Sequence, residues 1–373
     1  MASPRTWIWQ QREWPRFGWD AGALAPSLAA ARLAQGKVLG AASMLDPQLT
    51  LEAVGAILAE DGLTTSAIEG ERLDPAAVRS SVARHLGLPT AGLPAPSRGV
   101  DGLIEVLLDA TQHHDARLTR KRLFGWQAAL FPTGRAGLRT IRTGRLRGRE
   151  PMQVVSGAAG RERVHFEAPP LARLGADLDR FLEWFERPPR DLDGLVRAGI
   201  AHLWFVTLHP FESGNGRLAR AVTDMALAQD ERQPLRVFSL SAQLLREREA
   251  YYTALERTQR GGLDVTVWLS WFLDQVASAA TAADGTIAGT LAKARFWLRH
   301  QATDLNPRQR RALNRLLDAG PGGFEGGMNT RKYMSLTSTS RATAYRELSE
   351  LVERGCLAPT AKGGRSSGYQ IVW

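Results

Sequence analysis

The sequence predicts a mainly α-helical protein with one β-hairpin and a C-terminal winged helix-turn-helix. Apolar residues recur at helical spacing from about residue 170 to 285. The runs "MQVV" and "RVHF" flank "SGAAGRE" and predict a hairpin over 152–166. The last 68 residues, from Asn306, run in the order helix, short helix, helix and hairpin, which is the order of a winged helix.

Composition indicates a soluble globular protein that binds polyanions. The 373 residues suggest two or three domains, and 44% hydrophobic with 23% charged residues is ordinary. The net charge of +10 favours nucleotides, nucleic acid or an acidic partner surface. Cys356 is the single cysteine, so no internal disulfide is expected. There is no apolar run of about 18 residues and no secretory signal, so we expect a cytoplasmic protein without membrane contact.

Residues 1–99 are expected to form an N-terminal region rich in tryptophan. Its first part, "TWIWQQREWPRFGWD", carries Trp7, Trp9, Trp14 and Trp19. We expect an arm that packs these rings on the main domain, with a peptide or nucleobase site as the open alternative.

Helices are predicted to follow the tryptophan-rich arm. One is expected to stop at Asp61–Gly62, and a short second helix then fits 63–69 with Gly70 as its C′ residue. Asp74 and Pro75 are typical of a helix N-cap and first position. Further helices are expected from about residue 100.

The stretch "GRAGLRTIRTGRLRGRE" holds six arginines between Arg135 and Arg149. It is either a solvated loop or a basic rim beside a phosphate site.

The string "HPFESGNGRLAR", from His209 to Arg220, indicates the chemistry. It follows the apolar helix "GLVRAGIAHLWFVTL". Glycines at a helix start let backbone N–H groups bind an anion, and Arg217 and Arg220 can reach phosphate oxygens. His209 can accept a proton from a hydroxyl. This set suits transfer of a phosphorus-centred group.

The string resembles the signature of Fic (filamentation induced by cAMP) proteins, His-Pro-Phe-x-Asp/Glu-Gly-Asn-Gly-Arg-x-x-Arg, at every fixed position except one. The hairpin lies where these proteins keep their target-docking flap, and "REREAYYTALERTQRGGLDVTVWLSWFL" is similar to the region after the motif. The resemblance implies a helical Fic core over 100–285. It also implies protein adenylylation, in which AMP moves from ATP to a Ser, Thr or Tyr hydroxyl of a target protein.

The resemblance assigns roles within the motif. It makes His209 the general base and places Phe211 beneath the loop as its anchor. Nucleotide binding falls to Phe211, Gly214, Asn215, Gly216, Arg217, Arg220, Tyr251 and Tyr252, the two tyrosines as walls of the base pocket.

Ser213 departs from the signature, which has an acidic Mg²⁺ ligand at this position. A serine hydroxyl can ligate Mg²⁺ but adds no negative charge. The metal can be held mainly by the nucleotide, Glu212 can substitute after a loop shift, or the site can bind nucleotide without turnover. We favour weakened but real transferase activity, because His209 and both arginines remain.

The stretch "TTSAIEGER" matches an inhibitory pattern of the same family, Ser/Thr-x-x-x-Glu-Gly/Asn. Thr65 and Glu69 lie four residues apart on one helix face and Gly70 follows, so the inhibitory helix is expected at about 63–70. The resemblance implies that Glu69 binds Arg220 in place of the γ-phosphate and keeps ATP out of the productive pose. A surface glutamate at a helix end is the plain alternative.

The C-terminal part is expected to be a linker helix at 286–305 and a winged helix at 306–373. From Asn306 the chain has eleven Lys or Arg against five Asp or Glu, a net +6. We lean slightly toward DNA binding over a protein-binding module. The candidate DNA-binding residues are Ser340, Arg341, Thr343, Arg346, Lys362 and Arg365.

The leading prediction is thus an adenylyltransferase that uses ATP and Mg²⁺ and is inhibited by Glu69. One alternative is a DNA-binding regulator whose site binds nucleotide with little turnover. Another is a Fic enzyme that removes AMP or transfers a different nucleotide. A homodimer is a further expectation, and the target protein is not encoded in any motif.

Overall fold

The structure is a computed structural model that describes residues 7–45, 47–88, 90, 93–157, 161, 163–234, 236–320, 324, 326–360 and 368–373. The chain forms two compact units. One contains Met1–Met44 and Leu51–Ala283, and the other contains Leu45–Thr50 and Asp284–Trp373. Helices dominate both units, and the described strands form only two-stranded antiparallel sheets, so the mainly α prediction is confirmed.

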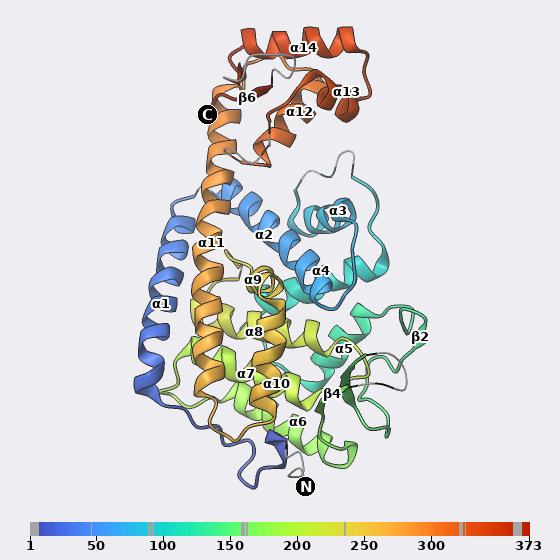
Figure 1. Cartoon of the computed structure of the whole chain (residues 1–373), viewed down its shortest axis with the longest axis vertical. Coiled ribbons are helices and arrows are strands. Elements are labelled where there is room, and N and C mark those ends of the chain that lie inside the picture. The colour runs from blue at the N-terminus through green and yellow to red at the C-terminus, as the bar shows by residue number, and fades with distance from the viewer. Residues whose placement is uncertain are drawn as a thin grey trace. The chain divides into compact units, whose positions relative to one another are not determined.

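Up to the long helix α11, the elements follow one another along the chain as shown in Figure 1. They are η1 (Ile8–Gln10), α1 (Ala21–Ser43), α2 (Pro47–Ile68), α3 (Pro75–Leu86), α4 (Arg98–Gln112), α5 (Arg120–Leu130), β1 (Arg135–Ala136), β2 (Arg139–Thr140), β3 (Gln153–Ser156), β4 (Arg163–Glu167), α6 (Leu171–Glu186), α7 (Gly194–Leu208), α8 (Asn215–Glu231), α9 (Leu240–Arg246), α10 (Arg248–Gln259) and α11 (Thr266–Arg299).

Helices α7 and α8 form the centre of the first unit, with the other helices around them (Figure 1). Every residue of α7 from Leu195 to Leu208 is buried, as its apolar sequence requires. In α8 the residues from Leu218 to Ala228 are buried as well. The turn that joins the two helices is therefore fixed at both ends by the core.

Helix α2 is continuous from Pro47 to Ile68, so the predicted break at Asp61–Gly62 is wrong and the segment 63–69 is its last part. The Asp-Gly pair serves packing rather than a turn. A Cβ on Gly62 would lie 2.9 Å from Ile104 Cδ1, so glycine allows α4 to approach closely. Asp61 is buried and accepts a hydrogen bond of 2.6 Å from Ser239 Oγ. Both residues are accommodated inside the helix because each contacts a neighbouring segment: Asp61 contacts Ser239, and Gly62 lies against Ile104 of α4.

The end of α2 and the start of α3 match the sequence prediction. Gly70 has φ +82° and follows the last turn as its C′ residue. Its N–H donates to Ala67 O at 3.0 Å, and the N–H of Glu71 donates to Ser66 O at 3.0 Å. Asp74 caps α3 by accepting a hydrogen bond of 3.0 Å from Ala76 N. These caps place Glu69 and Glu71 at a fixed helix end.

The tryptophan-rich arm packs on the first unit, and three of its four indoles are buried as expected. Trp7, Trp9 and Trp14 are buried, whereas Trp19 is 36% exposed. Trp7 meets the ring of Phe166 edge-on, and Trp9 Nε1 donates to Glu167 O at 2.6 Å. The arm thereby supports strand β4.

The predicted hairpin is confirmed as β3 and β4, which pair antiparallel with an irregularity between Val154 and Val155. His165 Nδ1 lies 2.6 Å from Glu256 Oε2, which joins the hairpin to α10. Residues 158–160 and 162 of the connecting turn lie outside the described residues.

The second unit shows the predicted order of helix, short helix, helix and hairpin. Its elements after α11 are α12 (Pro307–Leu317), α13 (Thr330–Thr337), α14 (Arg341–Glu353), β5 (Leu357–Pro359) and β6 (Tyr369–Ile371). A bridge between Met328 and Tyr369 adds to the hairpin. Cys356 is buried and free. Assignment as a winged helix stays a prediction, and the segment 286–299 continues α11.

None of the helices in the described ranges is both long and apolar enough to cross a membrane.

Candidate active site

The turn at residues 209–214 presents the side chains of the motif between the ends of α7 and α8. His209 ends α7 in the left-handed conformation with φ 48°. Asn215 Oδ1 accepts from Phe211 N at 2.9 Å, and Asn215 Nδ2 donates to Phe211 O at 2.7 Å. Phe211 is fully buried against Phe124, as its anchoring role requires. The side-chain amide of Asn215 thus stabilises the turn. The backbone N–H groups at the start of α8 can therefore bind an anion.

Gly214 and Gly216 allow close approach at the start of α8. Gly214 has φ +88°, and a Cβ there would lie 2.8 Å from Phe131 Cε2. A Cβ on Gly216 would lie 2.2 Å from Glu69 Oε1. The carboxylate of Glu69 therefore lies against the backbone of a helix N-terminus, where anions are favoured.

Arg220 is held by the last two turns of α2. Its Nη2 donates to Glu69 Oε1 at 2.8 Å, and its Nε donates to Thr65 Oγ1 at 2.6 Å. Burial would raise the pKa of Glu69, but the charge and hydrogen bond of Arg220 lower it below the ordinary value. Glu69 is thus an anion bound to a guanidinium, in the geometry that the inhibitory pattern implies.

A second carboxylate from the same helix end binds the other arginine of the motif. Glu71 Oε2 lies 3.1 Å from Arg217 Nη1, and the Arg217 guanidinium stacks 4.9 Å from the ring of Phe131. The sequence analysis missed Glu71. Glu71 follows Glu69 by two residues, and residues at this spacing do not share one face of a helix. The only sequence feature that points to Glu71 is the helix end at Gly70.

Each arginine keeps a donor for a further anion. Arg220 Nη1 and Arg217 Nε are buried, and neither has a hydrogen-bond partner within the described part of the chain. Buried guanidinium donors without an acceptor are costly, so a ligand with acidic oxygens is favoured here.

His209 is arranged as a base. Its Nδ1 lies 3.1 Å from Val206 O, so Nδ1 carries the proton and Nε2 is left as the acceptor. Burial lowers the pKa of His209 and the charge of Arg147 adds to this effect, while the Val206 hydrogen bond and Glu69 act in the opposite direction. The imidazole is therefore neutral at neutral pH.

The arginine-rich stretch supports the motif from outside. Arg147 is buried. Its Nε donates to His209 O at 2.9 Å, and its backbone N donates to Pro210 O at 3.0 Å. Its Nη2 also donates to Pro169 O. Glu212 accepts from the backbone N of Arg142 at 3.0 Å and of Gly148 at 3.2 Å. Sequence reasoning missed the bracing role of Arg147, because nothing in a run of six arginines distinguishes the buried one.

Both carboxylate oxygens of Glu212 are therefore engaged by backbone N–H groups. Ser213 has no side-chain hydrogen bond among the residues that the structure describes, and in the same ranges no cluster of three or more His, Cys, Asp or Glu could hold a metal. One neutral hydroxyl does not fit a magnesium ion held by the protein.

The two tyrosines of α10 are separated by burial. Tyr251 is 1% exposed, and its hydroxyl lies 2.8 Å from Nε2 of His202, which is itself buried with its pKa lowered to about 3. Tyr252 is 37% exposed and donates to Ile68 O at 3.2 Å. Tyr252 is thus accessible beside the end of α2, whereas Tyr251 belongs to the interior.

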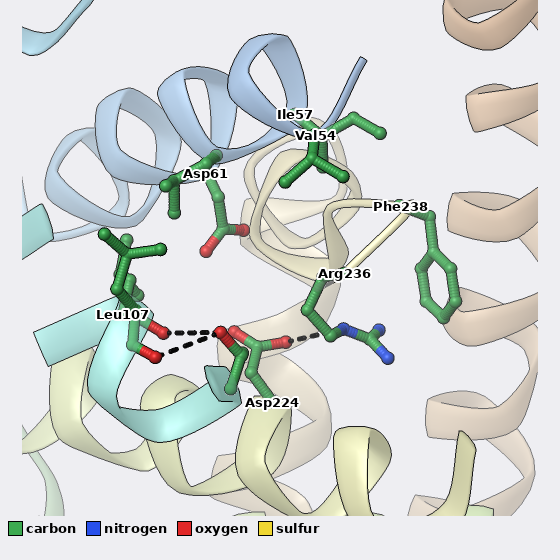
Figure 2. Close-up of a pocket in the computed structure, with 10 residues that line it drawn as sticks. Val54, Ile57, Asp61, Leu107, Asp224, Arg236 and Phe238 are labelled. Atoms are coloured by element: carbon green, nitrogen blue, oxygen red, sulfur yellow. Dashed lines mark hydrogen bonds and ion pairs between the residues drawn. The ribbon is translucent and has the colours of Figure 1, made fainter. Parts of the chain in front are cut away.

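A small cavity with a mostly apolar lining lies among α2, α4, α8 and the segment that carries Arg236 and Phe238. Figure 2 shows Asp61, Asp224 and Arg236 around it, with an ion pair of 3.7 Å between Arg236 and Asp224. Its volume of about 20 Å³ suits one water molecule. Burial raises the pKa of both aspartates. Asp61 precedes Thr65 by four residues, so this cluster fixes the face of α2 that carries Thr65 and Glu69.

Four of the six candidate DNA-binding residues, Ser340, Arg341, Thr343 and Arg346, lie in the N-terminal half of α14 or cap it. Ser340 caps α14 by accepting from Thr343 N at 3.3 Å, and its hydroxyl also meets the Thr343 hydroxyl. Arg341 and Arg346 are exposed. Lys362 and Arg365 lie outside the described residues.

Comparison with known families identifies two regions of the sequence. The profile of the Fic/DOC family matches residues 117–227, which contain the whole motif. The chain therefore contains a Fic domain. A domain of unknown function (DUF4172) matches residues 7–88, the tryptophan-rich arm and the helix that carries Glu69. No curated protein matches the sequence.

Solved structures share the mainly α Fic fold. A Fic family protein from Desulfovibrio desulfuricans G20 aligns with a TM-score of 0.52 and 18% identity, over 93% of this chain and 96% of that one. A Fic domain containing signaling protein from Bacteroides thetaiotaomicron aligns with a TM-score of 0.51 and 16% identity, over 72% of this chain and 97% of that one. At these identities the likeness concerns the fold alone.

Proposed function

We propose that this Fic domain protein transfers AMP from ATP to a hydroxyl side chain of a target protein and that Glu69 restrains the reaction. The observation that carries the proposal is the assembly of a neutral histidine, a helix N-terminus and two buried arginines around one turn. Family membership supports nucleotidyl transfer in general. Positioning and charge neutralisation supply most of the catalysis in phosphoryl-type transfers.

The reaction uses His209 as the general base. Nε2 of His209 takes the proton of the target hydroxyl, and the hydroxyl oxygen forms a bond to the α-phosphorus of ATP. The bond from that phosphorus to the bridging oxygen breaks, and pyrophosphate leaves. Arg217 and Arg220 donate to the departing phosphates, which stabilises the developing negative charge.

Inhibition follows from the contact between Glu69 and Arg220. A carboxylate oxygen 2.8 Å from Arg220 Nη2 and pressed against Gly216 takes the place of a phosphate oxygen. The proposed substrate is ATP with Mg²⁺; Ser213 is the residue that would meet the ion, as a neutral ligand, and the ion would neutralise phosphate charge.

Incorporation of α-labelled nucleotides tests the proposal. Purified wild type, Glu69→Gly and Glu69→Gly/His209→Ala are incubated with labelled ATP, GTP, CTP or UTP and a bacterial lysate. We expect label from ATP on protein with Glu69→Gly, little with wild type and none without His209. Label from another nucleotide would change the reaction, and incorporation that survives loss of His209 would refute the mechanism.

A DNA-binding regulator is the second candidate, and Ser213 together with the basic first turn of α14 favours it. In that case Glu69→Gly binds ATP without incorporation, and duplex DNA binding depends on Arg341 and Arg346. The same incubation separates the two candidates.

A further inference from the structure

Five exposed arginines lie between α5 and β3, in the segment that contacts the motif turn at Glu212, and we call them the arginine rim. They are Arg135, Arg139, Arg142, Arg145 and Arg149. Together with the buried Arg147 they give residues 132–149 six positive charges and no carboxylate, and Glu150 is the first acid to follow. Such a density of one sign is unusual for a loop that carries no ligand of its own.

The rim has no acidic partner on its own chain. None of its five members forms an ion pair with a described residue. Arg139 donates to Glu212 O at 3.0 Å and Arg135 to Leu138 O at 3.0 Å, so these two meet only carbonyl groups. Exposed arginines elsewhere do find carboxylates, for example Arg84 with Asp101 at 2.7 Å.

Hydrogen bonds join the loop that carries the arginine rim to the motif turn, at His209 and at Glu212. Arg147, within the same loop, donates to His209 O and to Pro169 O after β4, and the Glu212 carboxylate accepts from two backbone N–H groups of the loop. The loop therefore links His209 to the base of the β3–β4 hairpin. A chain that brings a hydroxyl to Nε2 of His209 passes beside it.

An apolar tip lies among these charges. Leu138, in the turn between β1 and β2, is 94% exposed and is flanked by Arg135 and Arg139. Val155 of β3 is 47% exposed. Basic groups with single apolar contacts fit a peptide with acidic and apolar side chains better than a uniform polyanion.

We infer that the arginine rim binds an acidic segment of the target protein next to the modified hydroxyl. This inference rests on the proposed function and adds to it the class of target: a Ser, Thr or Tyr flanked by Asp or Glu. Arg142, Arg145 and Arg149 are the members whose guanidinium groups form no hydrogen bond or ion pair with a described residue, so they are the charges most available to such a partner.

The test uses short synthetic peptides with one central hydroxyl residue flanked by glutamate, by glutamine or by lysine. Fluorescence anisotropy without ATP measures their binding to the full chain with Glu69→Gly. The rim variant is Arg142→Gln/Arg145→Gln/Arg149→Gln. The matched control is Arg12→Gln/Arg79→Gln/Arg190→Gln, which removes the same charge from exposed arginines that make no ion pair with described residues.

We expect the glutamate peptide to bind with the highest affinity. The rim variant should weaken this affinity at least about tenfold, and the control variant less than about twofold. The affinity should also fall as the salt concentration rises. Equal binding of glutamate and glutamine peptides would overturn the inference. So would a duplex DNA that binds the rim more tightly than the peptide at equal charge.

AMP transfer to the same peptides is then measured separately. Rim-dependent binding without any transfer from ATP would refute the proposed function and leave the docking surface standing. Transfer that is indifferent to peptide charge and to the rim variant would refute the docking surface and leave the proposed function standing.

Discussion

Glu71 Oε2 lies 3.1 Å from Arg217 Nη1, and two residues earlier Glu69 Oε1 lies 2.8 Å from Arg220 Nη2. Both guanidinium groups of the motif are therefore paired with carboxylates from one helix end. The Gly70 cap sets the spacing of the two acids, because the chain turns between them. The proposed inhibition therefore involves two ion pairs, of which the one to Arg220 is the better shielded from solvent.

Glu71→Gln in the Glu69→Gly background is expected to raise ATP affinity a further threefold or so, since it frees Arg217 from an acid. The effect is small because the Glu71 side chain is 51% exposed and water screens the pair. Isothermal titration with a non-hydrolysable ATP analogue measures it, with the exposed Glu13→Gln as the control. An unchanged affinity would show that Glu71 makes a surface contact only.

Thr65→Val is expected to loosen the hold on Arg220 while keeping the shape of the side chain. It leaves the buried Nε of Arg220 without its acceptor, which costs about 2 kcal/mol of unfolding free energy. Urea denaturation measures this loss, and the basal rate of AMP transfer should rise. Thr64→Val is the control, because the Thr64 hydroxyl bonds only carbonyls of its own helix. Equal effects of the two variants would contradict a role of Thr65 at Arg220.

The pH dependence of Glu69→Gly reports on His209. A base with a lowered pKa is deprotonated at neutral pH and loses activity only when pH falls through that lowered value. Glu69 raises the pKa of His209, so its removal lowers that pKa further. We expect the acid limb of kcat/KM to lie below the ordinary histidine value of about 6.5. A limb above that value would contradict the lowered pKa of the neutral imidazole.

Glu69 itself predicts a second pH effect, on the wild type. Its folded pKa is lowered, so its contribution to stability is complete above the ordinary glutamate pKa and is lost as pH falls through the lowered one. Thermal denaturation of wild type and Glu69→Gln across acidic pH measures the difference between them, which should shrink toward low pH. A difference that grows toward low pH would reverse the sign we derive.

Ser213→Asp in the Glu69→Gly background is expected to lower the Mg²⁺ concentration for half-maximal AMP transfer about tenfold. The variant supplies the charge that the serine lacks, and Glu212 cannot do so while it accepts from Arg142 N and Gly148 N. A titration of activity with MgCl₂ measures the shift, with Ser213→Ala as the control for loss of the hydroxyl. An unchanged midpoint would show that position 213 does not meet the metal.

Much of the fold was predictable because local rules agree with packing. The caps at Gly70 and Asp74, the hairpin and the apolar helix before His209 all follow from residue types at fixed spacing. The break expected at Asp61–Gly62 was wrong because the turn signal of an Asp-Gly pair was overridden by tertiary contacts. Those contacts, to Ile104 and Ser239, are remote in sequence and leave no local trace.

The part of the candidate site that lies within the contiguous motif 209–220 was predictable from the sequence. His209, Arg217 and Arg220 follow one another along the chain, and Glu69 was found through its short pattern. Glu71, Arg147 and the engagement of Glu212 depend on how separate segments meet. A sequence shows the charge of these residues but not which of them is buried, and burial decides their roles.

The central claim, that Glu69 restrains a His209-dependent AMP transfer, is tested most directly by intact-protein mass measurement after incubation with ATP and Mg²⁺. Wild type, Glu69→Gly and Glu69→Gly/His209→Ala are compared for self-modification. A mass gain of one AMP on Glu69→Gly alone is the predicted result. A gain on wild type equal to that on Glu69→Gly, or a gain that persists without His209, would contradict the claim.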